Sequence, residues 1–227
     1  SCSWESVQNR IARLARNCIA MHGSLNRSRA LREDLTADGL ESFDVSKYFP
    51  SHVSILTGKD SQYIYSLAHM NFIRKGSMTP AQKKRKNELK TRWKTTKGAL
   101  SKSFAKAMQV IPEQWDRKSM PKLVLATDLH PVYPGALRSL PALAESLEEG
   151  SFVHQRYSSK LPRDALNPLF ASNYVDRLIR KDVACYARES SCDNRNSSSE
   201  MYRAMTYMTW HNYEKRFRIR PKHDADD

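Results

Sequence analysis

The feature that most constrains the fold is a short, continuous apolar segment, LVLATD, at residues 123–128. Apolar runs of this length, bounded by turn residues, are typical of strands buried on both faces of a sheet. The run ends in the carboxylate of Asp128, and the residues that follow, LHPVYPG, indicate a turn. The segment therefore predicts a central strand that ends at a carboxylate.

The segments around this strand alternate between strand and helix patterns. Between residues 31 and 65, short apolar stretches are separated by Gly39, Pro50 and Gly58, which predicts three strands joined by turns. This order predicts an α/β fold with a mixed sheet and helices on both faces. The other predicted elements are helices at 100–110, 134–147, 167–190 (the longest) and 200–210, a strand at 152–157 and a polar loop at 193–199.

The first segment, residues 3–21, has apolar residues at helical spacing, with Ser3 or Ser6 as the cap and Gly23 and Asn26 as the expected end. Its arginines gather on the opposite side. Two interpretations stay open: the last helix of a DNA-binding helix-turn-helix module, or a helix that packs on the domain with a solvated basic face.

The charge balance limits the class of partner. Thirty-eight Lys and Arg against 24 Asp and Glu leave a net charge of +14, which favours a polyanion such as nucleic acid or an acidic membrane surface; a basic protein with no such partner is the alternative. No apolar run is long enough to cross a bilayer and no signal-peptide pattern opens the chain. Four cysteines without C-x-x-C spacing predict reduced thiols in a cytoplasmic protein.

Positive charge is densest at residues 74–97, where ten Lys and Arg accompany one acid, Glu88. Pro80 suits the first turn of a helix, with Thr79 as its cap. Such a run is either a solvated helix face or a surface that contacts phosphates, and the basic chain favours the second. The candidate DNA-binding residues here are Arg74, Lys75, Lys83, Lys84, Arg85 and Lys86.

Two carboxylates are the leading candidates for chemistry. Asp128 ends a buried strand, where α/β sheets place ligands, although an Asp that caps the following turn is the alternative. Asp38 and Glu41 lie on either side of a glycine in an early strand, ADGLESF. Asp38 can meet Asp128 if the two strands are neighbours in the sheet.

The helix expected from residue 167 supplies a third group. Asn173, Arg177 and Arg180 fall on one side, with Asp176 at its margin, opposite an apolar stripe. An ordinary polar face with an Asp176–Arg180 pair is the alternative. Two or three oxygen ligands in a cleft can hold Mg²⁺, and paired ions promote phosphoryl transfer. The stripe consists of Val175, Leu178, Ile179, Val183 and Tyr186.

Four segments resemble the catalytic domain of bacterial insertion-sequence transposases, which are DDE-type enzymes of the ribonuclease H and retroviral-integrase superfamily. The resemblance implies a ribonuclease H-like fold, and it covers most of the chain after residue 30. It implies a catalytic domain at 31–220, a tail at 221–227, and a basic helix at 1–30 as the remnant or linker of an upstream DNA-binding region. The segments are TDLHPVYPGAL (127–137), HQRYSSKL (154–161), NPLFASNYVDRLIRKDVACYARES (167–190) and YMTWHNYEKRF (207–217).

The resemblance also implies a site. Asp38 and Asp128 match the first two catalytic aspartates, and the third position, usually Glu, aligns with Asn173. This departure leaves three possibilities: an Asp-Asp-Asn site, Asp176 as the substitute, or an inactive copy. The implied cofactor is Mg²⁺ or Mn²⁺, as two ions, and Arg177, Arg180 and Lys181 are implied to contact DNA.

The function implied by the resemblance is metal-dependent DNA strand cleavage and strand transfer in transposition. Double-stranded DNA, both transposon ends and target, is the expected partner of a homodimer or larger assembly in the bacterial cytoplasm, at the nucleoid. A metal-dependent nuclease of the same fold and a catalytically inactive DNA-binding relic are the alternatives.

Overall fold

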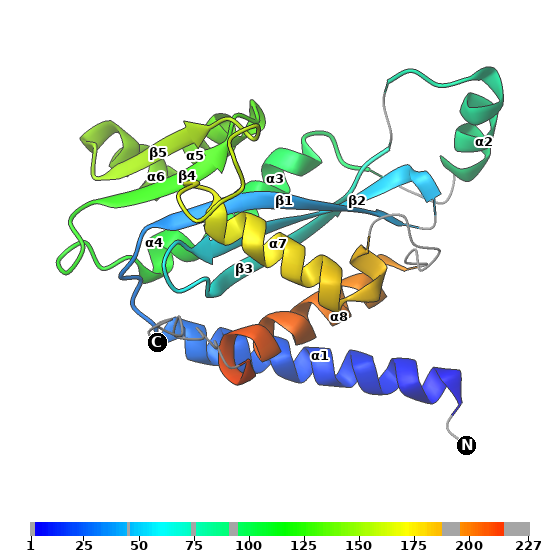
Figure 1. The fold of residues 1–227 in the computed structure, drawn as a ribbon, viewed down its shortest axis with the longest axis horizontal. Helices are drawn as coiled ribbons and strands as arrows, with labels where there is room; N and C mark the ends of the chain where they lie inside the picture. The colour runs from blue at the N-terminus through cyan, green and yellow to red at the C-terminus, as the bar shows by residue number, and fades with distance from the viewer. Residues whose placement is uncertain (1–2, 45, 74–75, 91–94, 188–195, 216–227) are drawn as a thin grey trace, which may run out of the picture.

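A five-stranded sheet forms the centre of the protein in a computed structural model, which describes residues 3–44, 46–73, 76–90, 95–187 and 196–215 (Figure 1). The strand order is β3-β2-β1-β4-β5, with β4 parallel to both neighbours and β1, β2 and β3 antiparallel. The predicted α/β fold is confirmed, and the architecture is consistent with a ribonuclease H-like fold. The strands are β1 (Leu35–Asp44), β2 (Ser46–Gly58), β3 (Ile64–Asn71), β4 (Leu123–Asp128) and β5 (Phe152–Tyr157).

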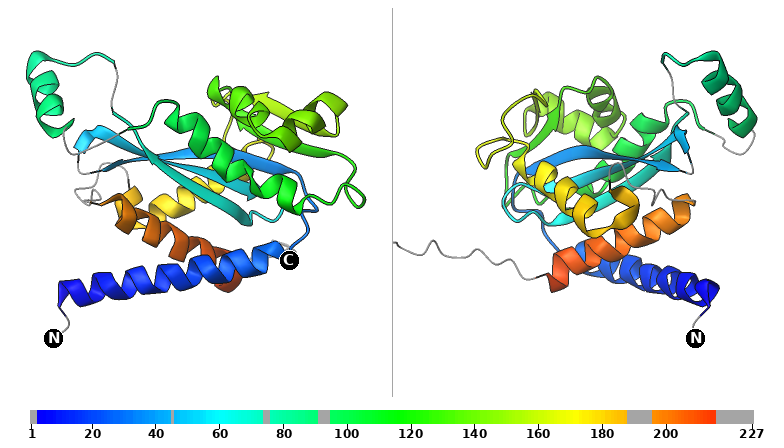
Figure 2. Two further views of the ribbon diagram at one scale, coloured as in Figure 1. Left: turned by 180° about the vertical axis from the view of Figure 1, so that it is seen from behind. Right: turned by 45° about the vertical axis from the view of Figure 1, so that its right-hand side comes forward.

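Helices cover both faces of the sheet (Figures 1 and 2). One face carries α3, α5 and α6, the other carries α7 and α8, and α1 packs on the outer side of α8. Within the described residues no helix is long and apolar enough to cross a membrane. The helices are α1 (Trp4–Arg27), α2 (Pro80–Lys90), α3 (Ala99–Met108), α4 (Val110–Gln114), α5 (Val132–Arg138), α6 (Pro141–Glu149), α7 (Phe170–Asp182) and α8 (Ser197–Thr209), with a 3₁₀ turn at Ala184–Tyr186 and a π turn at Trp210–Glu214.

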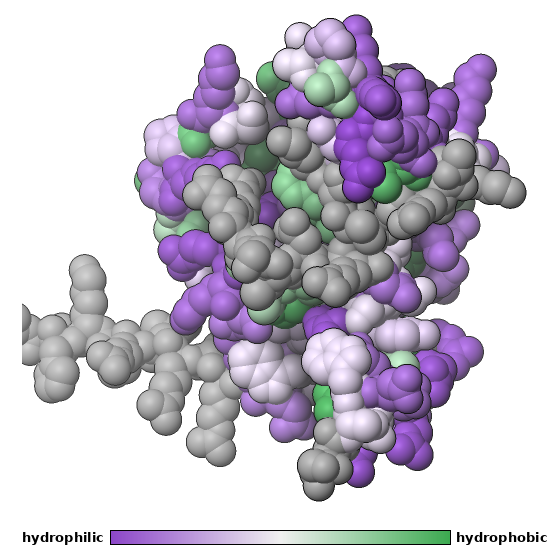
Figure 3. Space-filling model, turned by 90° about the vertical axis from the view of Figure 1, so that its right-hand side faces the viewer, coloured by the Kyte–Doolittle hydropathy of each residue, from purple (hydrophilic) through white to green (hydrophobic). Residues whose placement is uncertain are grey.

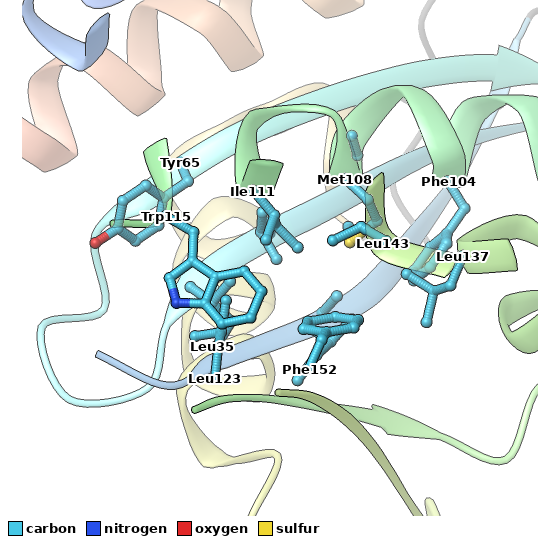
Figure 4. Packing of buried hydrophobic residues seen from close by; sticks show 14 of the residues in the cluster. Leu35, Tyr65, Phe104, Met108, Ile111, Trp115, Leu123, Leu137, Leu143 and Phe152 are labelled. Atoms are coloured by element: carbon cyan, nitrogen blue, oxygen red, sulfur yellow. The ribbon is translucent and has the colours of Figure 1, made fainter. Parts of the chain in front are cut away.

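The larger hydrophobic core lies between the sheet and α3, α5 and α6 (Figure 4). Phe104 of α3 stacks on Tyr133 of α5 with ring centroids 4.1 Å apart. Leu35 of β1 and Leu125 of β4 are aligned in the parallel ladder and are both fully buried in this core. These contacts fix β4 beside β1.

A second core lies between the sheet and α7 and α8. The whole apolar stripe predicted for α7 and the turn after it is buried here, so that prediction is confirmed. The buried carboxylate of Glu200 on α8 accepts a hydrogen bond of 2.7 Å from the Ser51 hydroxyl of β2. This bond joins α8 to the sheet through a polar contact inside the core.

The first helix is longer than predicted. Ser3 caps α1 by accepting a hydrogen bond from the Ser6 amide, as expected, but the helix continues through Gly23 and Asn26 to Arg27. Tertiary contacts offset the helix-breaking tendency of these residues, because His22 Nε2 and Asn26 Nδ2 both lie within hydrogen-bond distance of the Tyr65 carbonyl oxygen. The helix packs on the domain with its arginines at the surface.

Other boundaries also differ from the prediction. The helix expected at 134–147 is two helices, because Pro141 starts a new one after Ser139 and Leu140. The helix expected to be the longest ends at Asp182, and α1 is longer. Residues 188–190, at its expected end, and 193–195, in the expected polar loop, lie outside the described part; α8 begins already at Ser197, inside that loop.

Gly39 and Pro50, which were expected in turns, lie inside β1 and β2. A side chain at Gly39 would have its Cβ 2.1 Å from Cε1 of His52 on the neighbouring strand. The His52 ring is buried and packs edge-on against Phe72, so it has little room to move. Gly39 is therefore required by a close approach within the sheet.

We expect Gly39→Ala to lower the free energy of unfolding by about 1–3 kcal/mol, the usual cost of overpacking a core. In a His52→Ala background the same substitution should cost much less, since the clash is removed. Urea denaturation of the four proteins measures both values. An equal cost in both backgrounds would show that the His52 ring does not set the requirement.

Candidate active site

The parallel pairing of β1 and β4 places Asp38 and Asp128 side by side. Ala37 is aligned with Thr127, so Asp38 and Asp128 are the next residues of the two strands. Neighbouring strands lie about 4.8 Å apart. Because side chains alternate and Ala37 and Leu125 belong to the larger core, both carboxylates are directed to the opposite face, where α7 lies.

Backbone amides hold both carboxylates in place. Asp38 Oδ1 accepts a hydrogen bond of 2.7 Å from the Gly39 amide, and Asp128 Oδ1 accepts one of 2.8 Å from the His130 amide. The turn-capping interpretation of Asp128 is therefore correct for that oxygen. Both side chains are half-buried, so solvent still reaches the pair.

The electrostatics bring a third carboxylate and a cation into the same site. Burial raises the pKa of Asp38 to about 6; the Gly39 hydrogen bond opposes this shift, while the negative charges of Asp128 and Asp176 add to it. The positive charge of Arg163 lowers the same pKa slightly. The pKa of Asp38 therefore depends on groups from four places: β1 itself, β4, α7 and the loop before α7.

The polar side of α7 lines a pocket of about 330 Å³. Asp176 Oδ2 accepts a hydrogen bond of 3.0 Å from Arg180 Nε, whereas Asp176 Oδ1 is buried with no hydrogen-bond partner among the described residues. The predicted Asp176–Arg180 pair is present, and the predicted grouping of Asn173, Arg177 and Arg180 is confirmed, because all four residues line the pocket.

The two candidates for the third position differ in charge. Asn173 and Asp176 lie almost one turn apart on α7 and line the same pocket. Asp176 adds negative charge at Asp38, whereas the Asn173 amide is neutral. Both residues line the pocket, so both stay candidates for the third position.

The donor atoms suit a hard divalent cation, since carboxylate oxygens are the ligands that Mg²⁺ and Mn²⁺ prefer. Repulsion among Asp38, Asp128 and Asp176 is what a bound cation would relieve. In the described part of the chain, however, no three His, Cys, Asp or Glu side chains are close enough to form a metal-ligand group. Asp176 is instead held by Arg180.

The predicted DNA-binding residues fall into two separate regions. Helix α2 begins at Pro80, and the Thr79 hydroxyl accepts a hydrogen bond of 3.3 Å from the Gln82 amide, which confirms the predicted start and cap. The helix projects from the body of the protein and does not lie beside α7 (Figures 1 and 2). Lys83, Lys84 and Arg85 are exposed and Lys86 is half-buried, while Arg74 and Lys75 lie outside the described residues.

Hydrophilic side chains cover much of the upper part of the face on which α2 lies (Figure 3). On α7, Arg177 and Lys181 are exposed. Arg180 is half-buried and donates to Asp176 and to the carbonyl oxygens of Glu41 and Tyr186. The Arg180 guanidinium therefore holds Asp176 and the neighbouring backbone in place, whereas Arg177 and Lys181 are exposed to solvent.

Sequence reasoning missed Arg163, Phe170 and Tyr174, which line the pocket beside the predicted residues. Phe170 and Tyr174 are one turn apart on α7, a spacing that places them together, but aromatic residues at this spacing more often belong to a core. Arg163 lies in the loop between β5 and α7, and no local pattern indicates that its charge reaches Asp38.

His154 lies on the opposite face of the sheet from the acidic pair. Its Nε2 is 2.8 Å from the Thr127 hydroxyl, and burial, with smaller contributions from Arg156 and Arg138, lowers its pKa to about 4. A neutral His154 therefore supports Thr127, the residue before Asp128. Cys18 and Cys185 are free, buried thiols, whereas Cys2 and Cys192 lie outside the described residues.

No protein-family model matches this chain, and no curated protein matches it significantly.

We expect Asp38→Asn to stabilise the protein at pH 7.5 but not at pH 4. The raised pKa means that the folded state keeps a proton that the unfolded state loses between about pH 4 and pH 6, so wild-type stability falls as pH rises through that range. Above pH 6, the free energy of unfolding of Asp38→Asn should exceed that of wild type by about 1–3 kcal/mol. Urea denaturation at both pH values tests this, and a wild type that gains stability relative to Asp38→Asn on raising the pH would contradict it.

Proposed function

We propose that the chain is the catalytic domain of a DNA transposase that cleaves and joins DNA strands by divalent-metal-dependent phosphoryl transfer. The observation that supports this most is the adjacency of Asp38 and Asp128 on parallel strands, with Asp176 facing them from α7. Two carboxylates ninety positions apart in the chain lie side by side at a solvent-accessible place, as the resemblance to DDE-type transposases implies.

Asp38 and Asp128 would hold the metal, with Asp176, or Asn173 through its amide oxygen, as the third ligand. A Mg²⁺ or Mn²⁺ pair held there would supply activation of a water or hydroxyl nucleophile and charge neutralisation on the leaving oxygen. Asp38 must be ionised to act as a ligand, and its raised pKa predicts that activity rises with pH through about 6 and levels off above it.

The other residues of the site would position the DNA. Arg177 and Lys181 are exposed on α7 and can neutralise backbone phosphates beside the carboxylates. Lys83, Lys84 and Arg85 on α2 would hold duplex further along the backbone. The buried contact between His154 and Thr127 keeps the end of β4 in place next to Asp128.

A catalytically inactive DNA-binding relic is the second candidate. The observation that favours it is the ion pair between Asp176 and Arg180, which occupies one oxygen of the third acidic group, together with Asn173 at the position where the family usually has Glu. The relic would bind DNA with no Mg²⁺-dependent activity. A nuclease of the same fold would cleave without joining ends, and a strand-transfer assay separates it from a transposase.

We expect Asp128→Asn to lower the rates of strand cleavage and joining more than about 100-fold. Loss of a residue that only orients a metal ligand costs about 10- to 100-fold, and loss of a ligand should cost more. DNA affinity measured in EDTA should stay unchanged. The substrates are labelled DNA duplexes that carry transposon ends, assayed with Mg²⁺ and with Mn²⁺.

Asp60→Asn is the matched control, because Asp60 is exposed in the turn between β2 and β3, away from the site. It should leave both rates unchanged. Equal activity of wild type and Asp128→Asn would refute the catalytic assignment, and Mg²⁺-independent binding with no cleavage by wild type would favour the inactive relic.

A further inference from the structure

We propose that the pocket on α7 binds an unpaired nucleotide of the DNA strand, with its base against Phe170 and Tyr174 and its phosphate against Arg163 and Arg177. This inference rests on the proposed function, since it names the form of DNA that the same site accepts.

The pocket has the size and lining that a nucleotide requires. Its volume of about 330 Å³ lies at the lower end of the range of about 300–1,000 Å³ that is usual for small-molecule sites. Its lining combines two aromatic rings, three arginines, Asn173 and Asp176. An apolar surface next to cations matches a planar base joined to a phosphate.

Phe170 and Tyr174 stack on each other and form an aromatic pair in the lining of the pocket. The Phe170 and Tyr174 rings have centroids 5.7 Å apart and are inclined by only 21°, and both side chains are half-buried. The guanidinium carbon of Arg177 lies 5.3 Å from the centre of the Tyr174 ring. Aromatic rings with neighbouring arginines are the usual surface on which single-stranded nucleic acid stacks, whatever its sequence.

Two of the three arginines in the pocket are available to a phosphate. Arg180 already donates to Asp176 and to two backbone carbonyls. Arg163 and Arg177 are exposed, and in the described part of the chain neither forms an ion pair with a carboxylate. The Asn173 amide offers a donor and an acceptor that suit the edge of a base.

The pocket lies on α7, the helix that packs on β1, which carries Asp38. Asp176 and Arg163 both line the pocket and both affect the charge state of Asp38. A base in the pocket would therefore place the adjacent phosphate near Asp38 and Asp128. A base inside a duplex is stacked and cannot enter such a pocket, so the nucleotide must be unpaired or turned out of the helix.

The experiment compares two labelled 20-base-pair duplexes, one fully paired and one with three mismatched pairs at an end. The affinity of the full chain for each duplex is measured in EDTA by fluorescence anisotropy. Wild type should bind the mismatched duplex more tightly. Tyr174→Ala should lose between about 5-fold and about 150-fold in affinity for the mismatched duplex, the range expected for one base stack, and little for the paired one. Tyr174→Phe should keep the preference.

Tyr202→Ala, on α8, is the matched control and should behave like wild type. A 2-aminopurine at the mismatched end gives a second readout, since its fluorescence should be quenched by wild type and not by Tyr174→Ala. Thermal unfolding confirms that each variant is folded, and Tyr174→Leu, which removes the ring but keeps an apolar side chain against the second core, tests the ring even if the alanine variant unfolds.

Equal binding of the two duplexes by wild type, or an unchanged preference in folded Tyr174→Ala, would overturn the inference. Competition by free dAMP as effective as that by the mismatched duplex would also overturn it, because the pocket would then take a free nucleotide. These outcomes do not depend on cleavage. If the protein cleaves DNA in an Asp128-dependent way but does not prefer the mismatched duplex, the proposed function stands and the pocket inference fails. If it prefers the mismatched duplex but does not cleave, the pocket inference stands and the proposed function fails.

Discussion

The candidate site depends on the register of the parallel pair β1 and β4. Leu35 packs beside Leu125 in the larger core, and Asp34, just before β1, accepts a hydrogen bond of 3.0 Å from the Val124 amide. A slip of one residue in either strand would turn its aspartate to the opposite face, since side chains alternate along a strand. Hydrophobic burial at the start of the two strands therefore fixes the position of the carboxylates further along.

Helix α7 adds to this pair by having two different sides. Its apolar stripe is buried in the second core, and its polar side lines a pocket that includes Asp176. The site concentrates negative charge, and Arg163 and Arg180 partly compensate it: the first lowers the pKa of Asp38, and the second binds Asp176. In the proposals above, Arg163, Arg177 and the Phe170–Tyr174 pair would contact nucleic acid, so the metal site and the DNA site would share one helix.

Local patterns predicted the elements well but not their limits. The apolar run of β4, the Thr79–Pro80 start of α2 and the buried stripe of α7 follow from periodicity and capping, which depend on neighbours in the sequence. The boundaries failed where distant contacts decide. The hydrogen bonds of His22 and Asn26 to β3 extend α1 beyond Gly23, and pairing with β2 makes Gly39 part of a strand rather than a turn.

The sequence by itself determined the strand and helix order, the carboxylate at the end of β4 and the side of α7 on which Asp176 and Arg177 project, because spacing along a strand or helix fixes direction. Only the tertiary structure decided that Asp38 adjoins Asp128, that Arg180 holds Asp176 and that Arg163 completes the pocket. Burial, charge and hydrogen bonding act through space, and the groups that meet here come from segments that no local pattern connects.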